Sequence, residues 1–262
     1  MNPHPLQSPP ADRPPLFCVR GLIKAYGANR VLDGLDFDVV RGECLVIMGR
    51  SGSGKSVTLR QLNGLETTDA GSVLFDGEEI APLIERELYP LRRRVAMLFQ
   101  SGALFDSMDV HENIAFPLRE HTDLDEAAIA QRVREKLGVV RLPGVEELMP
   151  SELSGGMRKR VALARSLALD PEAVLFDEPT TGLDPVTSAT IGHLIASTQR
   201  ELGMTSVVVT HDVPLARRVG DRIGFLEGGR FRFIGTWREA EASDDETLTR
   251  FLHGKEETLD EV

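Results

Sequence analysis

Residues 44–63 read CLVIMGRSGSGKSVTLRQLN, and this stretch decides the fold. The apolar run from Cys44 to Met48 predicts a short buried strand. A helix is expected from about Lys55 to Asn63, because Gly64 is a good C-terminal stop. The loop between them, 49–56, matches GxxxxGK followed by Ser or Thr, a pattern that carries meaning between a strand and a helix. The stretch therefore predicts an α/β fold with a phosphate-binding loop.

This loop has the residues needed to hold phosphate groups. Its glycines let the backbone curl so that several N–H groups converge on phosphate oxygens, and the helix N-terminus adds its positive dipole end. Lys55 is expected to reach the β- and γ-phosphates of a nucleotide, and the Ser56 hydroxyl to ligate Mg²⁺. The alternative, a flexible glycine-serine turn, is disfavoured by the flanking elements. The candidate nucleotide-binding residues of the loop are Gly49, Arg50, Ser51, Gly52, Ser53, Gly54, Lys55 and Ser56.

Length and composition restrict the class of protein. The chain has 262 residues, 41% of them hydrophobic, which is enough for one large domain or a domain with an inserted lobe. Its formal net charge of -11 argues against nucleic acid as a partner, because non-specific binding relies on Lys and Arg. Basic clusters at 92–94 and 158–160 are expected to be solvated helix faces. The two cysteines, Cys18 and Cys44, form no CxxC pattern, which fits a reducing cytosolic compartment.

Neither a leader nor a membrane span is expected. The proline-rich start, 1–15, lacks a basic region followed by an apolar core, so it is interpreted as a disordered tail rather than a signal peptide. No apolar run approaches the roughly 20 residues of a membrane-spanning helix. Any membrane role would therefore require a separate partner chain.

The rest of the chain alternates strand and helix patterns. Strands are expected at 17–23, 35–40, 72–75, 95–99, 173–176 and 206–210, with a hairpin at 222–234. Helices are expected at 125–137, 154–169 and 191–202. The pattern predicts an α/β core with an antiparallel N-terminal layer and a mainly helical stretch, about 101–169, inserted between two sheet strands.

Three further motifs carry chemistry. The strand 173–176 ends in Asp177, which fits a residue that holds Mg²⁺ through water, and Glu178 is a candidate general base for an attacking water. The motif LSGGM, 153–157, opens a helix whose first N–H groups can meet a phosphate, while its serine can also be an ordinary helix cap. His211 follows the strand 206–210, which favours a functional role over a structural one.

The order of these motifs resembles that of the ABC ATPases, over roughly 16–235. The resemblance implies an ABC-ATPase nucleotide-binding domain over 16–242, with a RecA-like P-loop core, the N-terminal antiparallel β layer and an inserted α-helical subdomain at about 101–170. An acidic C-terminal tail, 243–262, would follow it. The implied reaction is ATP hydrolysis, with ATP and Mg²⁺ bound together.

The resemblance also implies roles for single residues. Tyr26 matches the aromatic that stacks on adenine, although core packing is its alternative. Gln100 matches the glutamine that touches Mg²⁺ and the attacking water. Met157 stands where the usual motif has Gln, so the contact of that Gln to the sugar is not implied. The implied catalytic residues are Glu178, His211 and Gln100; the implied metal-binding residues are Ser56, Gln100 and Asp177; and the further nucleotide-binding residues are Tyr26, Ser154, Gly155, Gly156 and Asp184.

One phosphate loop and one LSGGM motif per chain imply a second copy, since in ABC ATPases these motifs face each other across a dimer. Residues 99–107, 117–122 and 154–160 further resemble the Mla/Mkl-type ATPases, in which Met after the two glycines is usual. Those ATPases act with an integral membrane permease and an MCE-type lipid-binding protein, and they move phospholipids or related lipids between envelope membranes. The implied location is peripheral, on the cytoplasmic face of the inner membrane.

Alternatives to lipid transport remain at this point. One is an ABC ATPase that serves an importer or exporter of another substrate. A non-transport ABC protein usually has two cassettes, coiled coils, zinc insertions or strong basic patches, and a P-loop kinase would need neither LSGGM nor His211. The segment 101–122 is the candidate permease-facing groove, with a variable surface loop as its alternative.

Overall fold

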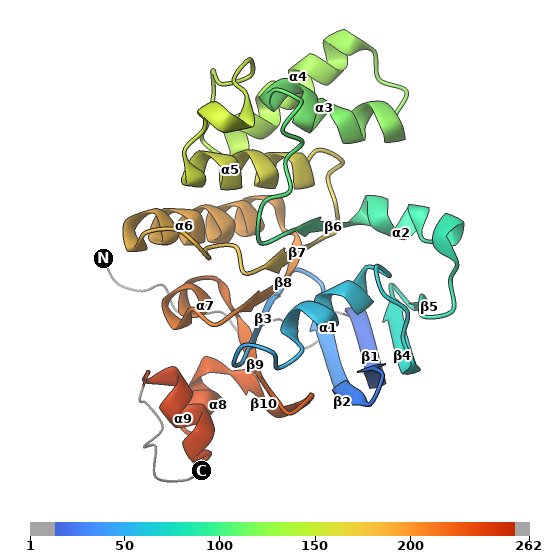
Figure 1. Ribbon diagram of the computed structural model, residues 1–262, viewed down its shortest axis with the longest axis vertical. Helices are drawn as coiled ribbons and strands as arrows, with labels where there is room; N and C mark the ends of the chain where they lie inside the picture. Colours follow the sequence, from blue (N-terminus) through green and yellow to red (C-terminus); the bar gives the residue numbers. More distant parts are fainter. Residues whose placement is uncertain (1–13, 255–262) are drawn as a thin grey trace.

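An antiparallel sheet forms the N-terminal layer of the computed structural model, which describes residues 14–254 (Figure 1). Its strand order is β2-β1-β4-β5. The strands are β1 (Pro15–Tyr26), β2 (Asn29–Val40), β4 (Ala70–Phe75) and β5 (Glu78–Glu79). The long hairpin of β1 and β2 confirms the antiparallel strands expected at 17–23 and 35–40.

The core sheet has the strand order β10-β9-β3-β8-β7-β6. Neighbouring strands are parallel except for the β9–β10 hairpin. The strands are β3 (Cys44–Met48), β6 (Val95–Leu98), β7 (Ala173–Asp177), β8 (Thr205–Thr210), β9 (Arg222–Glu227) and β10 (Arg230–Thr236). Because β3, β8 and β7 are adjacent and parallel, the segments that follow them leave the same edge of the sheet, where ligands of α/β folds bind.

Both faces of the core sheet are covered, as parallel strands require. Side chains alternate along β3: Leu45 and Ile47 pack with α1 and the N-terminal layer, whereas Val46 and Met48 pack with the helices of the opposite face. The helices around this sheet are α1 (Lys55–Leu62), α6 (Pro185–Leu202), α7 (Val213–Val219), α8 (Trp237–Glu241) and α9 (Glu246–Leu252). Within 14–254, no helix combines the length and hydropathy needed to cross a membrane.

A helical lobe is inserted between β6 and β7 and forms one end of the molecule (Figure 1). Its elements are α3 (Val110–His121), α4 (Glu126–Val139), the 3₁₀ turn η2 (Pro150–Glu152) and α5 (Gly155–Ser166). Ile129, Val133 and Leu137 of α4 are buried on one face, which confirms the helix expected at 125–137. A shorter segment, η1 (Glu85–Glu87) and α2 (Tyr89–Arg94), leads from β5 into β6.

Some element boundaries differ from the prediction for local reasons. Helix α6 begins at Pro185 rather than near 191, because the Asp184 side chain accepts hydrogen bonds from the N–H groups of Val186 and Thr187. Helix α5 ends at Ser166 rather than 169, before Asp170 adopts a positive φ of 50°.

The ends of the chain also differ from the prediction. Pro15, expected in the disordered tail at 1–15, is the first residue of β1 and follows Pro14, which has no regular secondary structure, while 1–13 lies outside the described residues. Within the acidic tail, α9 buries Leu248 and Leu252, and the Phe251 ring lies 4.9 Å from that of Phe225. The packed domain therefore continues past the expected boundary at 242, while 255–262 lies outside the described residues.

Two arginines and two carboxylates tie the N-terminal layer to the core sheet. Arg41 follows β2 and Asp76 follows β4, whereas Arg94 ends α2 just before β6 and Glu172 directly precedes β7. Glu172 forms ion pairs with Arg41, at 3.0 Å, and with Arg94, and both arginines also pair with Asp76. The Arg94 guanidinium also lies 4.6 Å from the centre of the Phe75 ring.

We expect Glu172→Ala to lower the free energy of unfolding by about 1–2 kcal/mol, because it removes the carboxylate that forms ion pairs with both Arg41 and Arg94. The Arg94 hydrogen bond, and then that of Arg41, holds the pKa of Glu172 below its ordinary value. The contribution is therefore present above the unfolded pKa and is lost as pH falls through the folded pKa. Denaturant titrations near neutral pH and below about pH 4 measure both effects. The exposed Glu147→Ala serves as control, and an equal loss in that variant would contradict the prediction.

Candidate functional site

The phosphate-binding loop connects β3 to α1 and is tightly backed by other strands. A Cβ atom on Gly49 would lie 2.3 Å from the backbone oxygen of Leu226 in β9. Gly54 has a φ of 103°, and a Cβ atom there would lie 2.7 Å from Leu32 in β2. Both positions therefore require glycine, and the loop keeps its backbone close to the sheet edge.

Lys55 begins α1 and turns its ammonium back toward the loop. Its side chain is 7% exposed, and Nζ donates hydrogen bonds to the backbone oxygens of Gly49 at 2.8 Å and Arg50 at 2.9 Å. Burial lowers the pKa of Lys55, whereas the carboxylates of Glu178 and Asp177 oppose this shift. The loop thus holds a buried cation 3.9 Å from Glu178.

Ser56 and Asp177 meet across the start of α1 and the end of β7. The Ser56 hydroxyl donates a hydrogen bond of 2.7 Å to the Asp177 carboxylate. A hydroxyl oxygen and a carboxylate oxygen are ligands that Mg²⁺ prefers, so this pair fits the ion. Nearby in the loop, Ser53 Oγ is shielded from solvent and has no hydrogen-bond partner within the described chain, which also fits a loop that receives a polar ligand.

Glu178 and His211 form the second part of the cluster. Nδ1 of His211 lies 3.0 Å from the Glu178 carboxylate, and the hydroxyls of Thr181 and Thr210 lie 3.4 Å from it. Glu178 has a φ of 45°, which is uncommon for a residue with a side chain and often marks a functional position. The sheet edge therefore brings together a lysine, a serine, two carboxylates and a histidine.

Tyr26 and Gln100 are not joined to this cluster by a hydrogen bond or ion pair in the part of the chain that the structure describes. Tyr26 ends β1 with an exposed ring, and its hydroxyl donates to Glu66. Gln100 follows β6 and is exposed; its backbone oxygen accepts a hydrogen bond from Lys159.

The LSGGM motif belongs to the helical lobe. Ser154 caps α5 by accepting a hydrogen bond of 3.3 Å from the N–H of Met157. A Cβ atom on Gly156 would lie 2.7 Å from Thr187, and one on Gly155 would lie 3.3 Å from Leu183, so this motif packs against the start of α6, which Asp184 caps. In one chain, the first turn of α5 and the phosphate-binding loop lie in separate parts of the fold (Figure 1).

Two features of the site were missed or misread from the sequence. The hydroxyls of Thr181 and Thr210 were not singled out, although Thr210 directly precedes His211 and Thr181 lies three residues after Glu178. The expectation that 158–160 is a solvated helix face is wrong for Lys159, which is 7% exposed. The helix turns this residue inward because α5 packs between the other lobe helices and the segment after β6.

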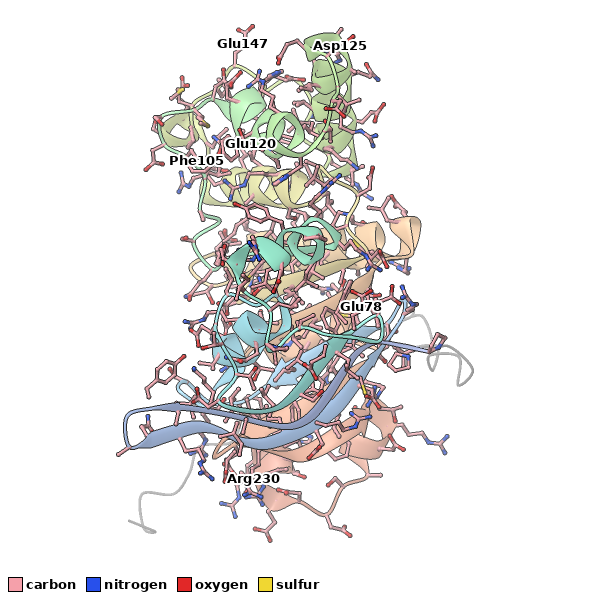
Figure 2. All side chains as sticks on the ribbon, turned by 90° about the vertical axis from the view of Figure 1, so that its right-hand side faces the viewer. Glu78, Phe105, Glu120, Asp125, Glu147 and Arg230 are labelled. Atoms are coloured by element: carbon pink, nitrogen blue, oxygen red, sulfur yellow. The ribbon has the colours of Figure 1, made fainter. Side chains whose placement is uncertain are left out.

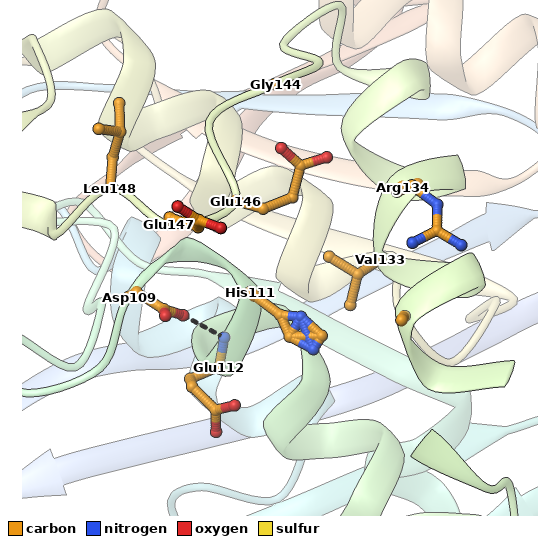
Figure 3. Close-up of a pocket in the computed structure, with 10 residues that line it drawn as sticks. Asp109, His111, Glu112, Val133, Arg134, Gly144, Glu146, Glu147 and Leu148 are labelled. Atoms are coloured by element: carbon orange, nitrogen blue, oxygen red, sulfur yellow. Dashed lines mark hydrogen bonds between the residues drawn. The ribbon is translucent and has the colours of Figure 1, made fainter. Parts of the chain in front are cut away.

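A cavity of about 690 Å³ lies elsewhere, between α3, α4 and the loop before η2 (Figure 3). Its polar lining includes Asp109, His111, Glu112 and Arg134. None of the residues predicted for the nucleotide site lines it. The cavity is therefore separate from the sheet-edge cluster.

If the chain hydrolyses a nucleotide with Mg²⁺, as its motifs predict, Ser56→Ala is expected to raise the Mg²⁺ concentration needed for half-maximal hydrolysis and to lower kcat by at least about tenfold, because the hydroxyl predicted to ligate Mg²⁺ is lost. Ser56→Thr keeps the hydroxyl and should retain most activity. Hydrolysis measured against Mg²⁺ at saturating nucleotide tests both variants. Equal Mg²⁺ dependence in wild type and Ser56→Ala would contradict the metal assignment.

Comparison with known proteins extends these observations. A family model described as "ABC transporter" matches residues 32–181. The chain is 44% identical over 237 residues to the "Probable ribonucleotide transport ATP-binding protein mkl" of Mycobacterium leprae, covering 90% of this chain and 68% of that protein. It is 43% identical over 228 residues to the "Intermembrane phospholipid transport system ATP-binding protein MlaF" of Escherichia coli K12, covering 87% of this chain and 85% of that protein.

A solved structure supports the same relationship. The fold matches the ATP-binding cassette MJ0796, described as a dimer in a post-hydrolysis state bound to ADP and Pi, with a TM-score of 0.78 and 32% identity. The match covers 84% of this chain and 98% of that one. The family match, 32–181, spans the phosphate-binding loop, the LSGGM motif and both carboxylates at the end of β7. The chain therefore belongs to the ABC transporter family, as one of its ATPases.

Proposed function

We propose that the chain is the ATP-hydrolysing subunit of an envelope transporter that moves phospholipids. The observation that supports ATP hydrolysis by this chain is the sheet-edge cluster of Lys55, Ser56, Asp177, Glu178 and His211. These residues supply phosphate binding, metal ligands and a general base at one place. The lipid substrate rests on the name of the Escherichia coli relative and on the resemblance of 99–107 and 117–122 to Mla/Mkl-type ATPases.

Each residue of the cluster has a proposed task. The loop N–H groups and Lys55 would bind the β- and γ-phosphates, with Tyr26 stacking on the adenine. Glu178 would accept a proton from the attacking water, and His211, hydrogen-bonded to it, would orient its carboxylate and contact the γ-phosphate. Gln100 would complete this site once the helical lobe closes on the core.

Mg²⁺ is the proposed metal, held by Ser56 and Asp177 with Gln100 as a further ligand. When bound, it would neutralise the charge that develops on the phosphates. The chain's own contribution would be to hold the Ser56 hydroxyl and the Asp177 carboxylate side by side, and the hydrogen bond of 2.7 Å between them supports this assignment.

A homodimer with two composite sites is proposed. The first turn of α5 presents Ser154, Gly155 and Gly156 at a helix N-terminus, away from the loop of the same chain. A two-fold partner would bring this turn and its Asp184 over the first chain's nucleotide. The dimeric state of MJ0796 with ADP and Pi is consistent with this arrangement.

Integral membrane permease subunits and an MCE-type lipid-binding protein are the other proposed partners, with the chain peripheral at the cytoplasmic face of the inner membrane. Phe105 and Phe116 form an exposed ring pair, with centroids 5.2 Å apart, inside the segment 101–122 (Figure 2 labels Phe105). An exposed aromatic pair on a lobe beside the nucleotide site is a suitable anchor for a partner helix.

The decisive experiment is to purify the ATPase with its native membrane partners and to identify bound molecules by mass spectrometry. Phospholipid carried by the complex, with hydrolysis stimulated when that lipid is added in vesicles, supports the proposal. Because the Mycobacterium leprae relative is named for ribonucleotide transport, ribonucleotides are the matched comparison. Stimulation by ribonucleotides without bound lipid, or purification without any membrane partner, would overturn the lipid assignment.

A further inference from the structure

Lys159 is a buried lysine on α5, five residues after Ser154. Its Nζ donates a hydrogen bond to the backbone oxygen of Gln100, across 59 positions of sequence. Lys159 is 7% exposed, and burial lowers the pKa of its ammonium, whereas the Asp177 carboxylate opposes this shift. Burying an ammonium is costly unless it is hydrogen-bonded, so the contact with Gln100 is a strong constraint on both elements.

A second basic side chain of α5, that of Arg165, contacts the same segment at Gly102, two residues after Gln100. Arg165 donates a hydrogen bond of 3.0 Å to the backbone oxygen of Gly102, and its guanidinium lies 5.5 Å from the centre of the Phe105 ring. Gly102 has a φ of 80°, and a Cβ atom there would lie 3.3 Å from Ala162 of α5. The segment from Gln100 to Phe105 is therefore held against α5 by hydrogen bonds from Lys159 and Arg165.

The other side of the segment is fastened to α3. The carboxamide of Asn113, which is fully buried, accepts from the N–H of Phe105 at 2.9 Å and donates to its backbone oxygen at 3.1 Å. Asn113 also donates to the backbone oxygens of Met108 and Asp109. The backbone of 100–109 thus forms hydrogen bonds with side chains of α3 and α5 in the helical lobe, although the segment follows β6 of the core sheet.

We propose that Lys159 is a positioning residue that makes Gln100 move together with the LSGGM turn of α5. This inference rests on the proposed function. In the proposed dimer, Gln100 serves the nucleotide of its own chain, whereas Ser154 to Gly156 serve the nucleotide of the partner. Lys159 would therefore connect the two composite sites through one chain, so that closure around one nucleotide favours closure around the other.

The test compares two substitutions at this position. Lys159→Met keeps an unbranched stem of similar size but removes the donor and the charge. In the complete complex with its permease, kcat should fall by at least about tenfold, with the KM for ATP within about threefold and the Hill coefficient for ATP falling towards one. Lys159→Gln keeps an amide donor for the Gln100 oxygen and should recover most of both kcat and cooperativity.

Lys136→Met is the matched control, because Lys136 is equally buried in the lobe but pairs with Asp170. It should lower the melting temperature while leaving kcat and the Hill coefficient unchanged. The proposal is overturned if Lys159→Met keeps wild-type kcat and cooperativity, or if both Lys159 variants lose activity only in proportion to melting temperature. A wild-type complex that hydrolyses ATP without carrying lipid would overturn the lipid-transport assignment but not the role of Lys159. The comparison of the Lys159 variants measures only ATP hydrolysis and its cooperativity, so the two failures can be told apart.

Discussion

Glu178→Gln is expected to lower kcat for ATP hydrolysis by about 10²–10³-fold while ATP affinity stays within about threefold. The amide keeps the shape of the side chain but cannot accept a proton from water. Glu178 is 12% exposed in its side chain and lies 3.0 Å from Nδ1 of His211, so the substitution acts inside an already assembled cluster. The Ser56–Asp177 pair is untouched. Steady-state hydrolysis and nucleotide titration of the complete complex measure the two quantities.

Glu147→Gln is the control for a carboxylate lost elsewhere. Glu147 is exposed at the far end of the helical lobe (Figure 2) and has no hydrogen bond or ion pair with the other residues of 14–254. This variant should hydrolyse ATP like wild type. Wild-type rates in Glu178→Gln would refute the general-base role, whereas a parallel loss of ATP affinity would mean that the carboxylate acts through Lys55 in binding.

Local patterns in the sequence predicted the elements of the fold better than their arrangement. The run from Cys44 to Met48 and the helix after it follow from apolar patterning and a glycine stop, which need no tertiary information. The pairing of β3 with both β8 and β9 joins residues more than 150 positions apart and depends on packing, which no local pattern encodes. The start of α6 was misplaced because the cap at Asp184 was not recognised as one.

The functional site likewise has parts that local sequence patterns predict and parts that depend on how the strands pack. Residues within a motif, such as Lys55 and Ser56, were named from spacing alone, because the motif fixes their local geometry. The contact between Glu178 and His211 was not predicted, since it requires knowing that β7 and β8 are neighbours. Lys159 was misread because three consecutive basic residues resemble a solvated surface, and only packing shows which one faces inward.

Lys55→Ala is expected to weaken ATP binding by at least about 100-fold, and hydrolysis with it. The substitution removes a buried cation from the loop, and a 100-fold loss of affinity corresponds to about 2.7 kcal/mol, which is the size expected for a charge-assisted contact to phosphate. It also leaves the backbone oxygens of Gly49 and Arg50 without the Lys55 donor, which loosens the loop. Titration with a fluorescent ATP analogue, in the presence of Mg²⁺, measures the affinity directly.

The difficulty with Lys55→Ala is that a destabilised protein would also lose binding. Lys136→Ala separates the two causes, because it removes an equally buried lysine from the lobe and disturbs only an ion pair with Asp170. If both variants lose melting temperature to a similar extent but only Lys55→Ala loses affinity, the loss belongs to the phosphate site. Unchanged affinity in Lys55→Ala would refute the phosphate-binding role of the loop, and a similar loss in both variants would assign the effect to folding. The two lysines are similarly buried, with exposures of 7% for Lys55 and 5% for Lys136, and they differ in what surrounds the ammonium, so the comparison isolates the chemistry of the loop.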